Sequence, residues 1–192
     1  MVRVGFIVEG ETEKILIESR NFMHWLTDSE IELIRPVLNA KGGGNLLPQN
    51  IEPMILQLME KKAHFIVILT DLEYDTSEEA VLLRIGTQHT DLIYIAVKAI
   101  EAWFLADTDA MNKWLKTSDF IEEYPEKTPD LPWKRLKDIA NNLNKRGPGN
   151  SKPVFAKKMI EHYCFLVQNA AQHKHCPSAK KFRDALLLLG NK

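Results

Sequence analysis

"VGFIVEGETEK" (residues 4–14) decides the expected fold of this chain. A continuous apolar run, typical of a strand buried on both faces, stops at Glu9 and Gly10, and two further acids follow at once. Glu11 and Glu13 fall in the first turn of an expected helix, where the helix dipole favours acidic side chains, so we interpret both as mostly structural. Glu9 has no such explanation, because it ends a buried strand. Glu9 is therefore the first candidate site residue.

Apolar runs and helical patterns alternate along the first part of the chain. The expected strands are residues 2–8, 31–38, 64–70 and 91–97. The expected helices are residues 11–26, 50–62, 76–86 and 99–115. Pro36 cannot donate a ladder hydrogen bond, so we expect it either to place the second strand at an edge of the sheet or to shorten that strand. Strand–helix alternation with apolar strands predicts an α/β fold, with a parallel sheet flanked by helices on both faces.

The composition changes near residue 117. A polar, proline-rich segment over residues 117–133 precedes three helical stretches that are rich in lysine and arginine. About 60 residues with few aromatic anchors would be marginally stable alone, so we expect this part to pack on the sheet. The sequence predicts an α/β domain over residues 1–116 and a helical, basic extension over residues 117–192.

The net charge of −1 hides a large asymmetry between the two parts. Residues 1–130 carry 12 Lys/Arg and 23 Asp/Glu, a net of −11, whereas residues 131–192 carry 13 and 3, a net of +10. The split indicates a basic surface for a polyanion beside an acidic centre that needs cations. The alternative is that two oppositely charged halves attract each other in an ordinary fold. The candidate nucleic-acid contacts are Lys98, Lys152, Lys157, Lys158, Lys180, Lys181 and Arg183.

The composition excludes several classes of protein. The chain has 192 residues, of which 45% are hydrophobic and 27% charged, as in a soluble globular protein. No apolar stretch approaches the roughly 20 residues of a membrane-spanning helix, and the N-terminus does not resemble a signal peptide. The two cysteines form no disulfide framework, so we expect a cytoplasmic protein.

Acidic residues also follow the other apolar strands. Asp71, Glu73 and Asp75 come at the end of the third expected strand, and Glu101 follows the fourth. Because sites of open α/β sheets lie outside the carboxyl ends of the strands, we expect Glu9, Asp71 and Glu73 to converge if their strands are neighbours. Glu101 starts a helix at the same end of the sheet, where it could be a further metal ligand. Two bare carboxylates about 4 Å apart repel by roughly 4 kcal/mol at an effective dielectric near 20, so such a cluster needs a proton or a cation. Oxygen ligands favour Mg²⁺ or Mn²⁺.

Each of the weaker candidates has a structural alternative. Asp75 is equally well explained as a turn or cap residue, and Glu101 as an acid in the first turn of a helix. Lys98 lies just past the fourth expected strand, where it could face a phosphate. The stretch "KGGGN" (residues 41–45) either cradles a phosphate through backbone amides or is a simple connection, and it lacks the Lys-Ser/Thr ending of a P-loop.

Four stretches carry a resemblance to known families. "FIVEGETE" (residues 6–13) followed by "FIVILTDLEYD" (residues 65–75) resembles a TOPRIM domain, the Mg²⁺-binding fold of topoisomerases, primases and OLD-type nucleases. Together with "KAIEAWFLAD" (residues 98–107) and "CPSAKKFRDAL" (residues 176–186), the first stretch also resembles the bacterial family DUF4276. The resemblance covers nearly the whole chain.

The TOPRIM resemblance implies roles for individual residues. Glu9 would be the acid/base, and Asp71 and Glu73 would bind the metal, with Glu73 standing where the pattern has a second aspartate. The expected function is a metal-dependent nuclease or other phosphodiester-processing enzyme. Related proteins work beside an ABC-type ATPase in bacterial defence against phage, so such a partner is implied. The alternative is a non-catalytic subunit that binds nucleic acid or the ATPase and keeps a relict site.

Overall fold

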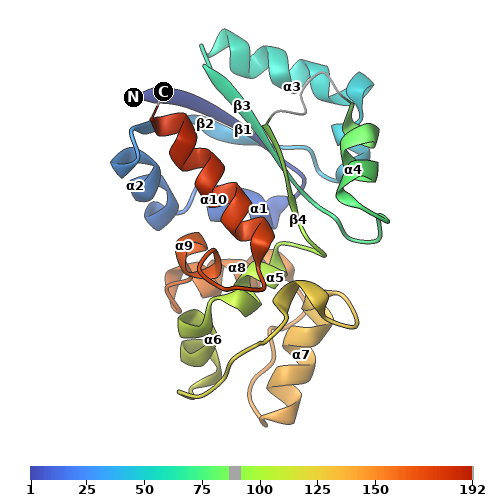
Figure 1. Cartoon of the computed structure of the whole chain (residues 1–192), viewed down its shortest axis with the longest axis vertical. Helices are drawn as coiled ribbons and strands as arrows, with labels where there is room; N and C mark the ends of the chain where they lie inside the picture. The colour runs from blue at the N-terminus through green and yellow to red at the C-terminus, as the bar shows by residue number, and fades with distance from the viewer. Residues whose placement is uncertain (87–91, 192) are drawn as a thin grey trace.

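The computed structural model describes residues 1–86 and 92–191, and the strands in this part form one parallel sheet. The order across the sheet is β2-β1-β3-β4, so β2 lies at an edge, as Pro36 predicts. The α/β class with a parallel sheet flanked by helices is thereby confirmed (Figure 1). The strands are β1 (Val2–Val8), β2 (Ile31–Asn39), β3 (Phe65–Asp71) and β4 (Ile93–Ala96).

Helices cover both faces of the sheet and gather at one end of it (Figure 1). One face packs on α3 (Pro48–Glu60) and α4 (Glu78–Ile85), which share a buried cluster with alternate residues of the strands. The opposite face packs on α1 (Glu11–Ile17), α2 (Arg20–Asp28) and α10 (Pro177–Gly190). Beyond the carboxyl ends of the strands lie α5 (Glu101–Ala106), α6 (Thr108–Leu115), α7 (Pro132–Asn142), α8 (Lys152–Glu161) and α9 (Val167–Ala170), with the short 3₁₀ helices η1 (Gly43–Leu46) and η3 (Pro125–Lys127) in connecting segments.

The last helix joins the two parts of the chain. Figure 1 shows α10 lying across the face of the sheet, and its Phe182 is fully buried there. The Phe182 ring lies 6.4 Å from that of Phe6 in β1, 5.7 Å from Tyr94 in β4 and 5.3 Å from Trp103 in α5. Aromatic pairs at these distances add about 0.5–1.5 kcal/mol each beyond area burial. The C-terminal helix therefore shares its core with the sheet.

Two expected helices are each broken into two, which corrects the sequence prediction. The helix expected over residues 11–26 ends at Ile17, and the hydroxyl of Ser19 caps α2 by accepting from the amide of Phe22 at 3.3 Å. The carboxylate of Glu18, between the two helices, accepts from the amide of Val37 in β2 at 2.9 Å. The break therefore stabilises both a helix start and a sheet edge. The strand expected over residues 91–97 is β4, and residue 91 lies outside the described residues.

The second break is at Asp107, in the helix expected over residues 99–115. Asp107 is fully buried, and its carboxylate caps α6 by accepting from the amide of Ala110 at 3.1 Å. The same carboxylate accepts from the amide of Leu166 at 2.9 Å and contacts the side-chain amide of Asn169 in α9. Asp107 is therefore structural, as its distance from the strand ends indicates.

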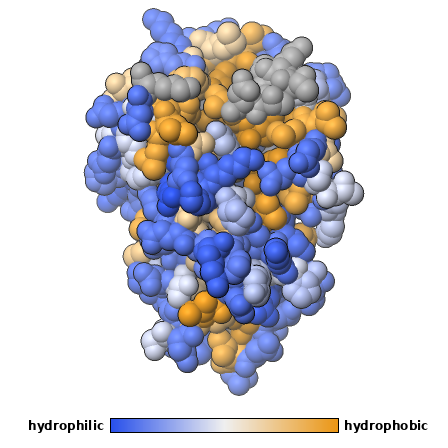
Figure 2. Space-filling model, viewed as in Figure 1, coloured by the Kyte–Doolittle hydropathy of each residue, from blue (hydrophilic) through white to orange (hydrophobic). Residues whose placement is uncertain are grey.

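Close packing also fixes the end of α10. A Cβ added at Gly190 would stand 1.8 Å from the backbone carbonyl oxygen of Ser29, which no side chain can accommodate. Figure 2 shows polar side chains over the end of the molecule that holds α5 to α9, and more apolar surface toward α3 and α4. None of the described helices is long and apolar enough to cross a membrane.

Candidate active site

The carboxyl ends of β1 and β3 lie side by side, because the two strands pair in parallel with Val8 opposite Leu69. Glu9 follows β1 directly, and Asp71 is the last residue of β3. The Oε2 atom of Glu9 accepts a hydrogen bond from the hydroxyl of Thr70 and another from the backbone amide of Asp71, the latter at 3.2 Å. The structure therefore brings together two acids that the sequence places 62 residues apart.

Asp71 connects this edge of the sheet to α5. Its Oδ1 atom accepts from the backbone amide of Ile100 at 2.8 Å, one residue before Glu101. Asp71 is only 8% exposed and Glu101 only 1% exposed. The first turn of α5 thus places a second buried carboxylate beside the strand ends. An acid that served only the helix dipole could stay exposed to solvent, and Glu101 does not.

The charges at this edge act strongly on one another. Burial raises the pKa of the Asp71 carboxyl well above its ordinary value. The negative charges of Glu13, Glu101 and Glu9 raise this pKa further, whereas the ammonium of Lys152 lowers it. We call Glu9, Glu13, Asp71 and Glu101 the carboxylate cluster. Its excess of negative charge in a low-dielectric surrounding creates a demand for protons or cations.

Lys152, in the first turn of α8, faces the cluster. Its Nζ atom lies 3.3 Å from Oε2 of Glu101, and this pair is largely shielded from solvent. Burial raises the pKa of Glu101, and the positive charge of Lys152 opposes that rise. Burial acts to lower the pKa of Lys152, but the negative charges of Glu101 and Asp71 outweigh it, so the pKa of Lys152 is raised overall. Among the described residues, Oε1 of Glu101 is buried without a hydrogen-bond partner. Lys152, expected to contact nucleic acid, thus acts here as an internal counter-ion.

Glu13 is a member of the cluster that the sequence interpretation missed. Its Oε2 atom accepts from the amide of Gly10 at 2.9 Å, as an acid at the third position of a helix commonly does. It is nevertheless only 4% exposed, and burial raises its pKa to about 7, with added contributions from the charges of Glu101 and Glu9. No pattern in the sequence signals this burial, because Glu13 also fits the capping role of an acid in the first turn of a helix.

The loop after β3 places the two remaining predicted ligands differently. Glu73 is exposed and has a left-handed backbone (φ 45°), and its amide donates to the carbonyl of Lys98 at 2.7 Å. Its charge acts on both Glu101 and Lys152, so it lies at the mouth of the carboxylate cluster. Asp75 instead forms an ion pair with Arg84 at 3.0 Å, which fits its interpretation as a turn residue.

A glycine-rich loop borders the cluster on the side of α4. A Cβ added at Gly43 would stand 3.1 Å from Oε1 of Glu9 and 3.0 Å from a guanidinium nitrogen of Arg84. Arg84 also donates to the carbonyl of Gly43 at 3.0 Å, and its Nε atom is buried without a partner among the described residues. The lack of a side chain at Gly43, in the stretch "KGGGN", therefore leaves room for Glu9 and Arg84 on the two sides of this loop. No pattern in the sequence points to Arg84.

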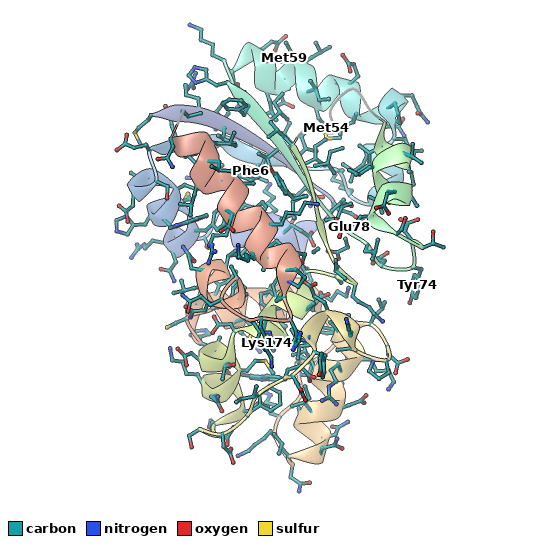
Figure 3. All side chains as sticks on the ribbon, viewed as in Figure 1. Phe6, Met54, Met59, Tyr74, Glu78 and Lys174 are labelled. Atoms are coloured by element: carbon teal, nitrogen blue, oxygen red, sulfur yellow. The ribbon has the colours of Figure 1, made fainter. Side chains whose placement is uncertain are left out.

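A cleft of about 430 Å³ opens beside the cluster. Its lining includes Glu73 and Lys152 from the mouth of the cluster, and Lys98, whose Nζ atom donates to the carbonyl of Thr128 at 2.7 Å. Tyr74 also lines the cleft and is 83% exposed, and Figure 3 shows it at the tip of the loop between β3 and α4. The four acids of the carboxylate cluster do not themselves line this cleft, so it adjoins the cluster through Glu73 and Lys152.

The donors of the cluster fit a hard divalent cation in their chemistry. All are carboxylate oxygens, the four acids outnumber the nearby cations Lys152 and Arg84, and Oε1 of Glu101 has no partner among the described residues. Within residues 1–86 and 92–191, however, no three His, Cys, Asp or Glu side chains stand where they would enclose a metal ion. A bound cation would thus require the acids to shift from the positions they take around Lys152.

Most of the predicted nucleic-acid contacts are neutralised by nearby acids. Lys157 pairs with Glu161, Lys180 and Arg183 pair with Asp184, Lys181 pairs with Glu78, and Lys152 pairs with Glu101. Among the predicted lysines, the side chain of Lys158 forms no ion pair with any described residue, and Lys98 is held by a carbonyl. The basic part of the chain is therefore less available to a polyanion at these positions than its composition indicates.

The fold and the site define an α/β protein with a carboxylate cluster at the carboxyl edge of a parallel sheet. Residues 8–187 match the family described as "Domain of unknown function (DUF4276)", so the chain belongs to that family, as the resemblance implies. No curated protein and no solved structure matches the chain.

Proposed function

We propose that the protein is a metal-dependent enzyme that processes phosphodiester bonds of nucleic acid, with a TOPRIM-like site that uses Mg²⁺ or Mn²⁺. The observation that carries this proposal is the carboxylate cluster, in which Asp71, Glu13 and Glu101 are buried together at the end of β3 and the start of α1 and α5. A fold gains nothing in stability from burying like charges, so their retention at a sheet edge favours a functional site.

The proposed metal ligands are Asp71 and Glu101, with Glu73 at the mouth of the cluster. Oε1 of Glu101 supports this assignment, because it has no partner among the described residues. The metal would supply electrostatic stabilisation of the attacking and leaving oxygens of a phosphodiester. Asp75 is a weaker candidate, since it is paired with Arg84.

Glu9 and Glu13 are suited to moving protons. The hydrogen bonds to Oε2 of Glu9 fix its carboxyl and leave Oε1 directed toward the glycine-rich loop. The pKa of Glu13, raised to about 7 by burial, allows this side chain to hold or release a proton near neutral pH. Lys152 would then balance the charge of the site and offer its ammonium to a phosphate at the cleft.

The alternative function is a non-catalytic subunit that binds nucleic acid or an ATPase. Two observations favour it: Lys152 already neutralises Glu101, and no three potential ligands among the described residues enclose a metal position. An ABC-type ATPase partner is implied in both cases by resemblance to TOPRIM proteins of phage defence. A test of activity must therefore include such a partner as well as the isolated chain.

Calorimetric titration with Mn²⁺ distinguishes the two functions. Asp71→Asn removes a charge while its amide oxygen can still accept from Ile100, so the fold should be retained. We expect this variant to lose Mn²⁺ binding and metal-dependent cleavage. The matched control is Glu11→Gln, an exposed acid in the same helix as Glu13, which should change neither. Wild-type protein that binds no Mn²⁺, or an Asp71→Asn variant that cleaves normally with the ATPase, would reject the enzymatic proposal.

Glu9→Gln should separate proton transfer from metal binding. The amide keeps the shape of the side chain and can still accept from the amide of Asp71, but it cannot take up a proton at neutral pH. We expect Mn²⁺ affinity to fall by less than about tenfold and cleavage to fall by about 10²–10⁴-fold, the usual contribution of a general base. Equal losses of binding and cleavage would show that Glu9 is a ligand instead.

A further inference from the structure

Four unpaired cations gather around one cleft in the described part of the chain, and of these only Lys158 was expected from the sequence to contact nucleic acid. The side chains of Lys116, Lys145, Arg146 and Lys158 form no ion pair or hydrogen bond with any described residue, and all four are exposed. They lie on three separate segments: Lys116 ends α6, Lys145 and Arg146 precede α8, and Lys158 lies within α8. All four nevertheless line one cleft of about 440 Å³.

This cleft, which we call the basic groove, has an aromatic floor. Trp114 and Phe155 pack together at 4.9 Å between ring centres, and they are nearly inaccessible beneath the four cations. His162 and the half-buried Tyr163 form part of its wall. No acidic residue is among the described residues that line it.

Four cations around one hollow repel one another unless an anion lies between them. Several other lysines in the C-terminal part pair with an acid one helical turn away, as in Lys157 with Glu161 and Lys180 with Asp184. Such offsets keep a solvated helix face close to neutral. The four cations of the basic groove form no such pair with any described residue, which distinguishes them from these offset lysines.

We propose that the basic groove binds the phosphate groups of a nucleic-acid strand. Cations on three segments, spread around an open cleft rather than focused on one point, suit successive phosphates better than a single free anion. Tyr163, half-buried in the wall of the groove, offers a ring on which an unpaired base can stack, an interaction of about 1–3 kcal/mol. This assignment deepens the proposed function, because it rests on nucleic acid being the substrate, but it is independent of the metal chemistry.

The groove is connected to the carboxylate cluster by α8. Lys152, in the first turn of this helix, faces Glu101, and Lys158 lies six residues later, about 9 Å along the helix axis at 1.5 Å per residue. One nucleotide of a duplex strand covers about 3.4 Å, so this separation corresponds to about three nucleotides. A strand held in the groove would thus pass close to the carboxylates without occupying them.

Two variants with the same loss of charge test the proposal. The groove variant is Lys145→Gln/Arg146→Gln/Lys158→Gln, and the matched control is Lys157→Gln/Lys180→Gln/Lys181→Gln, which removes three paired cations. Binding of labelled oligo-dT, oligo-U and a mixed-sequence duplex is measured by fluorescence anisotropy in EDTA over a series of salt concentrations. Thermal unfolding of each variant verifies that the fold is retained.

We expect the groove variant to bind at least about tenfold more weakly at about 0.15 M salt. Its salt slope should fall by about 2 units, since each lost phosphate contact removes about 0.7–0.9. The control should change affinity less than about threefold, because the acid beside each of its cations leaves little net positive charge there to attract a phosphate. Equal losses in the two variants, no loss in the groove variant, or a wild type that binds none of the probes would overturn the proposal.

The same titration with Asp71→Asn separates this inference from the proposed function. If Asp71→Asn binds the probes normally while the groove variant does not, the groove is confirmed whether or not cleavage is ever observed. If wild type cleaves with Mn²⁺ and the groove variant binds and cleaves as well as wild type, the enzymatic proposal stands and the groove assignment is wrong.

Discussion

Glu13→Gln should stabilise the metal-free protein at neutral and alkaline pH. Burial raises the pKa of Glu13 from 4.5 to about 7, so the folded protein binds a proton at this carboxyl more tightly than the unfolded chain does. The stabilisation from that proton is fully present below pH 4.5 and is lost as the pH rises through about 7. The difference corresponds to ~3 kcal/mol at pH 8, at 1.36 kcal/mol per pKa unit. Glutamine is neutral at every pH and can still accept from the amide of Gly10.

The assay is urea unfolding in EDTA at pH 4.5 and pH 8. We expect Glu13→Gln to match wild type at the lower pH and to exceed it by up to about 3 kcal/mol at the higher, with a Tm higher by on the order of 5–10 °C. Glu11→Gln, an exposed acid in the same turn, should change the free energy of unfolding by less than about 0.5 kcal/mol. A Glu13→Gln effect that is the same at both pH values would refute the reasoning.

Three further substitutions test the packing and pairing around the site. Lys152→Met should cost about 2–4 kcal/mol in urea unfolding at pH 7 because it leaves Glu101 buried without its cation, and adding Glu101→Gln should recover most of the loss. Gly190→Ala should lower the free energy of unfolding by more than about 2 kcal/mol, whereas Gly147→Ala, with nothing within 4 Å of its Cβ position, should leave it within about 0.5. Ser178→Ala should lower the Tm by several degrees, because its hydroxyl accepts from the indole of Trp103 at 2.7 Å.

The strand ends were predictable because they depend on local pattern. An apolar run that stops at an acid predicts the carboxyl end of a buried strand. Because the carboxyl ends of parallel strands lie at the same edge of a sheet, Glu9 and Asp71 could be placed at that edge without knowledge of the strand order. The helix breaks at Ser19 and Asp107 were not predictable in this way. Each break depends on a partner that is distant in sequence. Beside Ser19, Glu18 accepts from the amide of Val37, and Asp107 accepts from the amide of Leu166.

Charge patterns were the weakest guide to the site. Glu13 has an adequate local role as a cap, which hid its burial in the carboxylate cluster. Counting lysines located the basic part of the chain but did not reveal which of them are paired, because a partner can be far away, as Glu78 is from Lys181. The local sequence pattern therefore predicts the strand ends, but only the three-dimensional structure shows which charged side chains have no ion-pair partner.

Asp107 has a consequence for how the protein opens. The amides of Ala110 in α6 and of Leu166 before α9 both bond to this one carboxylate, although they are far apart along the chain. Local unfolding of either segment removes a hydrogen bond from Asp107, which also binds the other segment. We therefore expect α6 and the segment before α9 to unfold locally as one cooperative unit. In hydrogen exchange, the Leu166 amide should therefore be as slow as the amides of α6, although it lies outside a helix.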